Sequence, residues 1–124
     1  MIGIMKNRIK KLTSEEIEIL KHHFQSLKFN NDFDLVYETQ VPNTGIVLLD
    51  GELELIKKKK IKSTVRPGNM LGIYKLLKNE PSELGCKVKG NSELLIIQKS
   101  DLMEALSDKN SELYAIIKEN IHET

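Results

Sequence analysis

The middle of the chain, over residues 33–98, is cut into short apolar runs by pairs of turn-forming residues. These pairs are Pro42-Asn43, Asp50-Gly51, Pro67-Gly68, Pro81-Ser82 and Gly90-Asn91. Short runs bounded by regular turn signals are typical of the strands of a β-sandwich or a β-barrel. The pattern therefore predicts a barrel of about seven to eight short strands at the centre of the fold.

The segment around Asp50-Gly51 gives the clearest strand signal. Residues 46–49 are all apolar, and leucine alternates with glutamate over 52–55. Because Asp-Gly supplies the positive φ angles of a two-residue turn, we expect these two runs to pair as a hairpin. The lysines at 57–60 follow, and we expect them to form the tip of a second hairpin that returns through 61–65.

An amphipathic helix is predicted before the strands, over residues 13–27. Thr13 and Glu16 have the spacing of a capping box, whose hydroxyl and carboxylate accept hydrogen bonds from free amides at the helix start. The apolar positions of one face, spaced at helical intervals, are Ile17, Leu20, Phe24 and Leu27. The polar segment 28–32 is expected to end this helix.

Two helices are predicted after the strands. Ser100 or Asp101 can cap a short helix, whose apolar positions are Leu102, Ala105 and Leu106. Residues 107–110 interrupt it. A second amphipathic stretch carries the apolar residues Leu113, Ile116, Ile117 and Ile121. A helix, a run of strands and further helices make an α+β domain.

One domain accounts for this pattern in a chain of 124 residues. We assign residues 13–124 to it and 1–12 to an N-terminal segment, which is an ordered helix, a flexible tail or a docking peptide. A net charge of +1 gives no electrostatic argument for nucleic-acid binding. No apolar run reaches the roughly 20 residues that cross a bilayer. We expect a cytoplasmic protein that neither binds nucleic acid nor inserts into a membrane.

Three stretches carry a resemblance to a known family. GIVLLDGELEL at 45–55 joins an apolar strand to an acidic-apolar strand, VRPGNMLG at 65–72 carries two spaced glycines, and ELLIIQKSDL at 93–102 runs from strand into helix. In this order they resemble the cyclic-nucleotide-binding domain family, which includes the catabolite activator protein and kinase regulatory subunits. The resemblance covers about residues 13–124 and implies a double-stranded β-helix, or jelly-roll, barrel.

The resemblance also places a phosphate-binding cassette between the second and third stretches. In the family, backbone amides of a short helix bind the cyclic phosphate, a glutamate holds the ribose and an arginine pairs with the phosphate. The cassette-equivalent positions here are Leu71, Gly72, Ile73, Tyr74, Ser82 and Leu84. Ile73 stands where the glutamate is expected, and Ser82, within one residue of register, where the arginine is expected.

No other arginine can take the missing place, because the chain has only Arg8 and Arg66, both outside 72–90. Lys78 or Lys87 could approach a phosphate, but a lysine lacks the planar fork of arginine. Losing a hydrogen bond to a charged group costs about 1.5–3 kcal/mol. Two such losses weaken binding roughly 10²- to 10⁴-fold. We therefore expect no cofactor and no ordinary binding of cAMP or cGMP.

The occupant of the cassette stays open between three alternatives. Ile73 and Leu84 fill the pocket themselves, or a partner protein covers the apolar residues of the short helix, which are Ile73, Tyr74, Leu76 and Leu77. In the third, a cyclic mono- or dinucleotide binds by a rearranged route through the backbone amides of 71–74.

Other conspicuous residues have structural explanations. The lysines at 57–60 suit a solvated hairpin tip that discourages edge pairing; as a functional patch they would contact nucleic acid or anionic lipid. His22 and His23 are neighbours on a helix and point about 100° apart, so they do not chelate one metal. Cys86 suits a small core position and has no histidine in the barrel to act as its base. We predict neither a metal site nor an enzyme.

These observations favour a stand-alone signalling or protein-interaction adaptor that keeps the fold and has lost the ligand. Its partner surface is expected on the last helix, where the stripe of Leu113, Ile116, Ile117 and Ile121 resembles the dimer helix of relatives. The partner is another protein or a second copy of the chain. The alternative function is a nucleotide sensor with a rearranged cassette. A third is a subunit whose missing function another protein of the same complex supplies.

Overall fold

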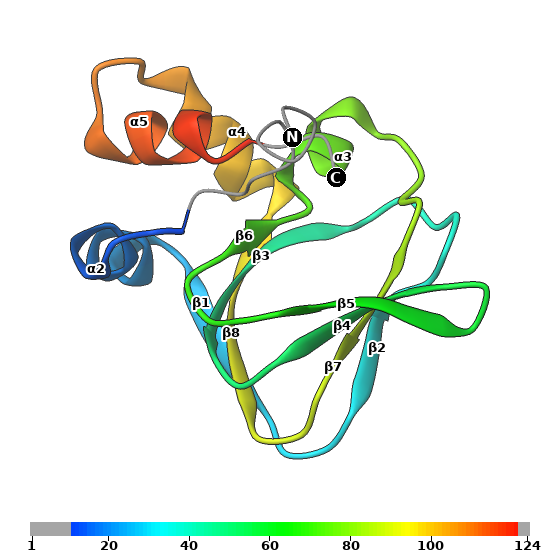
Figure 1. Ribbon diagram of the computed structural model, residues 1–124. Helices are drawn as coiled ribbons and strands as arrows, with labels where there is room; N and C mark the ends of the chain where they lie inside the picture. The colour runs from blue at the N-terminus through cyan, green and yellow to red at the C-terminus, as the bar shows by residue number, and fades with distance from the viewer. Residues whose placement is uncertain (1–10, 122–124) are drawn as a thin grey trace, which may run out of the picture.

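Eight antiparallel strands form two four-stranded sheets in the computed structural model, which describes residues 11–121. The first sheet contains, in spatial order, β1 (Gln25–Phe29), β8 (Ser92–Gln98), β3 (Thr44–Asp50) and β6 (Met70–Leu71). The second contains β2 (Phe33–Val36), β7 (Gly85–Val88), β4 (Leu53–Lys57) and β5 (Lys60–Val65). Helices α3 (Ile73–Lys78), α4 (Lys99–Ser107) and α5 (Glu112–Glu119) lie at one end of the barrel (Figure 1). This architecture confirms the predicted α+β jelly-roll.

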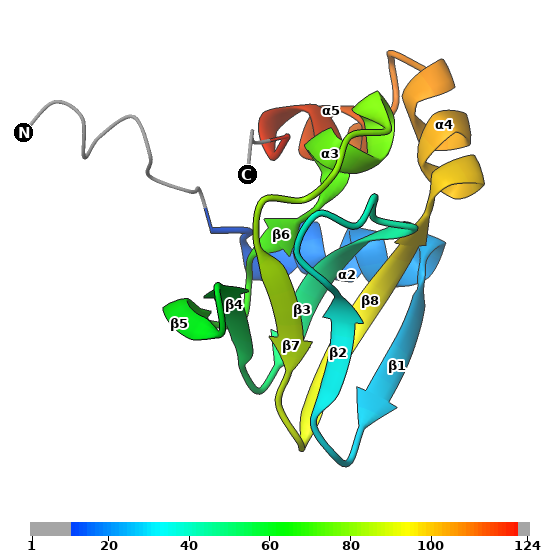
Figure 2. The same ribbon diagram turned by 90° about the vertical axis from the view of Figure 1, so that its right-hand side faces the viewer.

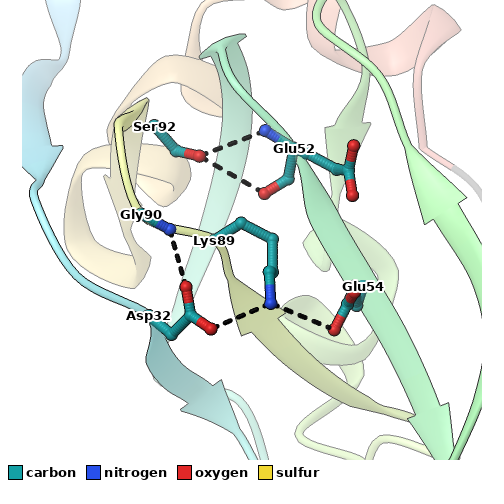
Figure 3. A network of polar contacts seen from close by, with 6 residues as sticks. All are labelled: Asp32, Glu52, Glu54, Lys89, Gly90 and Ser92. Carbon is teal, nitrogen blue, oxygen red and sulfur yellow. Dashed lines mark hydrogen bonds and ion pairs between the residues drawn. The ribbon is translucent and has the colours of Figure 1, made fainter.

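The strands on either side of Asp50-Gly51 do not pair with each other, so the hairpin predicted there is wrong. β3 pairs with β8 and β6 in the first sheet, whereas β4 pairs with β5 and β7 in the second. Gly51 has a φ of +93° and carries the chain from one sheet to the other. The Ser92 hydroxyl holds this crossing, because it accepts the Glu52 N–H at 3.1 Å and donates to the Glu52 carbonyl at 3.3 Å (Figure 3).

A charged network lies beside this crossing (Figure 3). Asp32 accepts hydrogen bonds from the Lys89 ammonium and the Gly90 N–H, each at 2.8 Å, and Lys89 also lies 3.8 Å from Glu54. The hydrogen bond from Lys89 lowers the pKa of Asp32, and the same bond raises the pKa of Lys89. The network joins the segment before β2 to the segment after β7.

The second predicted hairpin is confirmed. β4 and β5 pair from Leu53↔Val65 to Lys57↔Lys60. Lys58 and Lys59 form the turn between them, and the hairpin projects from the side of the barrel (Figure 1).

Helix α2 (Ser14–His23) begins with the predicted capping box. The Thr13 N–H donates to Glu16 at 2.9 Å, and the Glu16 N–H donates to the Thr13 hydroxyl at 3.1 Å. The helix is shorter than predicted, since Phe24 ends it and β1 begins at Gln25. Leu27, expected on the helical face, lies instead on β1 opposite Leu94 and is 44% exposed.

The apolar side chains form two cores. One lies between the sheets and includes Leu48, Leu53 and Leu94; the other packs helices against the outer face of the first sheet. Leu12 belongs to the second core, and its N–H donates to the Gly68 carbonyl at 2.8 Å. The fold therefore extends into the segment assigned to 1–12. The rest of that segment, 1–10, and residues 122–124 lie outside the described residues.

The first helix after β8 begins differently from the prediction, and the second forms over the predicted amphipathic stretch. α4 follows β8 directly at Lys99, without a side-chain cap from Ser100 or Asp101. The Ser111 hydroxyl caps α5 by accepting the Tyr114 N–H at 3.0 Å. Figure 2 shows α3, α4 and α5 together above the strands. Within residues 11–121, no helix has the length and apolar character needed to span a membrane.

Candidate functional site

A small cavity of about 60 Å³ lies between the sheets at the position of the predicted cassette. Strands β2, β4 and β7 form one side, and β3, β6 and the start of α3 form the other. The cassette-equivalent residues in its wall are Leu71, Gly72, Ser82 and Leu84. Ile73 and Tyr74 do not line it. The volume of the cavity is well below the roughly 300 Å³ of a typical ligand pocket.

Ile73 is a core residue. Its side chain is 1% exposed, and the tip lies over Gly45 of β3, where a Cβ would collide with it. Gly72 directs the side chain there, because its φ of +83° turns the chain from β6 into α3. The expectations that Ile73 fills the pocket or faces a partner are therefore corrected. At this position the chain has a packing contact in the core and no group that could hold a ligand.

Ser82 lies at the cavity wall with its polar atoms engaged. Its hydroxyl donates to the Leu84 carbonyl at 2.6 Å, its N–H donates to the Gln40 carbonyl at 2.8 Å, and its own carbonyl accepts the Thr39 N–H at 2.8 Å. These bonds tie the segment before β7 to the segment after β2. The hydroxyl can still accept a hydrogen bond, but it offers no charge to a phosphate.

Within the described part of the chain, one cationic residue lines the cavity: Lys75, which was not predicted from the sequence. Its side chain lines the cavity and is 13% exposed, and its ammonium lies 3.6 Å from the Glu80 carboxylate. Neither Lys78 nor Lys87, the lysines considered from the sequence, lines the cavity. Only the tertiary fold, which turns the third residue of α3 toward β2, could reveal Lys75.

The remaining wall of the cavity is chemically unreactive. Leu35, Leu55 and Cys86 line it, and burial raises the pKa of the Cys86 thiol to about 12. A thiol with such a pKa is almost entirely protonated at neutral pH and is a poor nucleophile. Among residues 11–121, no cluster of three or more metal-ligating side chains occurs.

The residues predicted to form a partner surface on α5 point inward. Leu113, Ile116 and Ile117 are 8%, 5% and 0% exposed, and Ile121 packs against the same core. Because this stripe is buried within a single chain, the expectation that it is free for a partner is corrected. A dimer through this helix would have to use its opposite face, and the homodimer itself stays a prediction.

A larger and shallower groove of about 340 Å³ lies between α2 and the α4–α5 pair. Apolar residues such as Phe24 and Leu113 form part of it. Its acidic residues are Asp101, Glu104, Asp108 and Glu112. The groove is at a different place from the cassette and carries charge of one sign.

No family model matches the sequence, and no curated protein matches it. Solved structures do share the fold. A structure from a cyclic-GMP-dependent signalling pathway that regulates bacterial phytopathogenesis has a TM-score of 0.74 at 16% identity, over 88% of this chain and 91% of that chain. A cyclic nucleotide-binding domain from Methylobacillus flagellatus has a TM-score of 0.70 at 20% identity, over 92% of this chain and 68% of that chain.

A third similar structure is the regulatory subunit of a cAMP-independent protein kinase A from Trypanosoma cruzi, bound to guanosine. Its TM-score is 0.62 at 16% identity, over 79% of this chain and 35% of that chain. At these identities the similarity establishes the fold. The fold is that of a cyclic-nucleotide-binding domain, as the resemblance implied.

Proposed function

We propose that the chain is a degenerate cyclic-nucleotide-binding-like domain that acts as a signalling or protein-interaction adaptor in the cytoplasm, without ordinary binding of cAMP or cGMP. The observation that carries this proposal is the cassette cavity, which measures about 60 Å³ and has neither a carboxylate nor an arginine in its wall. A nucleotide needs both more space and partners for its ribose and phosphate. The domain works without a cofactor and is not an enzyme.

The geometry adds an obstacle that the missing side chains alone do not. Ile73 is buried in the core above Gly45 and does not line the cavity, so its side chain offers no group to a ligand there. The Ser82 hydroxyl donates to a backbone carbonyl of its own loop. To bind a cyclic nucleotide, the protein would have to open new space and rearrange its existing hydrogen bonds. The free energy that each of these changes costs lowers the affinity further.

A protein partner is supported by the free edges of the two sheets. Leu27 on β1 and Phe33 on β2 are 44% and 51% exposed, and each of these strands pairs with a neighbour on one side only among residues 11–121. Unpaired strand edges with exposed apolar side chains are surfaces to which another chain can add a strand. The partner is another protein or a second copy of this chain.

The ligand half of the proposal is tested by thermal unfolding with cAMP, cGMP, cyclic dinucleotides and guanosine. A ligand present at 100 times its Kd stabilises the folded state by about 2.7 kcal/mol, roughly 10 °C in Tm for a domain of this size. We expect no shift with cAMP or cGMP at millimolar concentration. A shift of several degrees with either would contradict the proposal.

The partner half is tested by affinity capture with matched variants. A partner retained by the wild type should be lost with Leu27→Ser/Phe33→Ser and kept with Met103→Ser, since Met103 lies on α4 and is 55% exposed. If the wild type and both variants retained the partner equally, the partner would not bind at the sheet edges.

One observation favours a second function, a sensor of a nucleotide or nucleoside with a rearranged cassette. The Lys75 side chain lines the cavity, with its ammonium 3.6 Å from the Glu80 carboxylate, and the Trypanosoma cruzi regulatory subunit of the same fold is bound to guanosine. A thermal shift with one member of the panel that disappears in Lys75→Met, but persists in Lys78→Met, would support this function over the adaptor.

A further inference from the structure

The β4–β5 hairpin ends in an arrangement that folding alone does not favour. Lys57 and Lys60 lie directly opposite each other across the two strands, and like charges in that relation destabilise a sheet. Lys58 and Lys59 form the turn with φ angles of 51° and 66°, a left-handed backbone that residues with a Cβ avoid. Asn-Gly is the sequence that such a turn prefers, so neither turn geometry nor strand pairing explains the lysines.

The charge of this tip, the four lysines at 57–60, is not neutralised within the described part of the chain. Among residues 11–121, none of the four ammonium groups has a carboxylate within ion-pair distance. The Glu38 carboxylate accepts the backbone N–H of Lys58 at 2.6 Å, and its single negative charge offsets only part of the charge of the four lysines. Lys58, Lys59 and Lys60 are exposed to solvent.

Negative charge gathers elsewhere on the molecule. The acidic groove between α2 and the α4–α5 pair lies well away from the hairpin (Figure 1). The net charge of the chain is only +1, so the attraction to an anionic surface is local to the tip. Such a surface attracts the tip and repels the carboxylates of the groove.

Exposed apolar side chains accompany the lysines. Ile61, which follows Lys60, is 57% exposed, and Tyr37, which precedes Glu38, is 63% exposed. Lysine together with exposed aliphatic and tyrosine side chains is typical of segments that lie in the headgroup region of a membrane. We propose that the tip docks the domain on an anionic lipid surface, with the lysines among the headgroups and Ile61 at the edge of the acyl chains.

Lipid is favoured over nucleic acid because of Ile61. Both partners offer phosphates to the lysines, but only a lipid surface gives an aliphatic side chain an apolar environment in which to be buried. A projecting tip also reaches a flat surface without any preformed pocket. The inference goes beyond the adaptor function and does not depend on whether the cassette binds a ligand.

The test is sedimentation of the full chain with vesicles of phosphatidylcholine alone or with about one third phosphatidylserine, at low ionic strength. We expect binding only to the anionic vesicles, with release as salt is added. Lys58→Gln/Lys59→Gln should weaken binding about 30-fold, at about fivefold for each lysine. Ile61→Ser should weaken it about tenfold.

A matched control removes the same two charges elsewhere. Lys28 on β1 and Lys109 in the turn before α5 are exposed, and Lys28→Gln/Lys109→Gln should change binding by less than about twofold, since these lysines lie outside the range of the surface. No binding to anionic vesicles, equal losses in the two double variants, or an Ile61→Ser variant that binds like the wild type would overturn the proposal. Binding to a DNA or RNA oligonucleotide without binding to vesicles would overturn it in favour of nucleic acid.

Discussion

The contact between Ile73 and Gly45 leads to a prediction about stability. Because position 73 is buried against Gly45, it suits an apolar side chain and not a carboxylate. Ile73 is 1% exposed, and its tip occupies the space that a Cβ on Gly45 would need. Ile73→Ala removes three buried carbon atoms, worth about 2.4 kcal/mol at about 0.8 kcal/mol for each. Adding a cavity term brings the expected loss in unfolding free energy to about 3–4 kcal/mol.

The reverse change tests the same contact from the other side. Gly45→Ala inserts a methyl group into occupied space and should cost about 1–2 kcal/mol through overpacking. In the double variant the new methyl group partly fills the space that Ile73→Ala leaves. We therefore expect the double variant to be at least about 1 kcal/mol more stable than the sum of the two single losses implies.

Urea unfolding followed by far-UV circular dichroism measures all four proteins of this cycle. Lys78→Ala, an exposed change on the same helix, serves as the control and should stay within about 0.5 kcal/mol of the wild type. A loss below about 1 kcal/mol for Ile73→Ala, or losses that add within about 0.5 kcal/mol, would show that Ile73 does not pack on Gly45. The reasoning about the cassette would then be refuted.

Three further changes test the rest of the fold. Gly51→Ala should lower the unfolding free energy by about 2 kcal/mol or more, measured by urea unfolding, because φ is +93° and a Cβ would lie 2.6 Å from the Cα of Ser92. The lowered pKa of Asp32 adds stability that is present above its unfolded value of 3.8 and is lost as the pH falls through the folded value. The raised pKa of Lys89 adds stability that is present below 10.5 and is lost as the pH rises through its folded value. Asp32→Asn should flatten both limbs of a stability–pH curve, and limbs as steep as those of the wild type would contradict the pairing. Ile117→Lys should unfold the chain, since this side chain is 0% exposed; a folded variant by circular dichroism would place Ile117 on the surface.

Local sequence signals predicted the elements whose geometry is set by neighbouring residues. The capping box of Thr13 and Glu16 requires only a spacing of three residues, and it forms as expected. The turn at Lys58-Lys59 follows from the strands on either side of it. The stretch at 93–102 was expected to run from strand into helix, and it forms most of β8 followed by the start of α4.

Signals that depend on a distant strand were misread. Leu27 continues the helical spacing of α2, but pairing with β8 draws residues 25–29 into the first sheet. Asp50-Gly51 has the composition of a hairpin turn, yet β3 and β4 find their partners in different sheets. Leu27 pairs with Leu94, which is 67 positions away, and Leu53 pairs with Val88, which is 35 positions away. No local pattern contains such partners.

The sequence brought together only part of the candidate site. Leu71, Gly72, Ser82 and Leu84 line one cavity, and their role in ligand binding stays a prediction. Ile73 turns into the core because Gly45, 28 positions earlier, leaves room for it. Lys75 lines the cavity together with Leu35 and Val36, which lie about 40 positions earlier. The apolar stripe on α5 was predicted correctly, but its sequence pattern does not show what covers it. A helix face that packs on its own chain and one that packs on a partner have the same apolar pattern.

The central claim, that this cassette no longer binds cyclic nucleotides in the ordinary way, is tested most directly by isothermal titration of the purified chain with cAMP and with cGMP. We predict no heat of binding at ligand concentrations up to about 1 mM, since the two lost hydrogen bonds alone weaken binding about 10²- to 10⁴-fold. Saturable one-to-one binding with a micromolar Kd for either nucleotide would contradict the account.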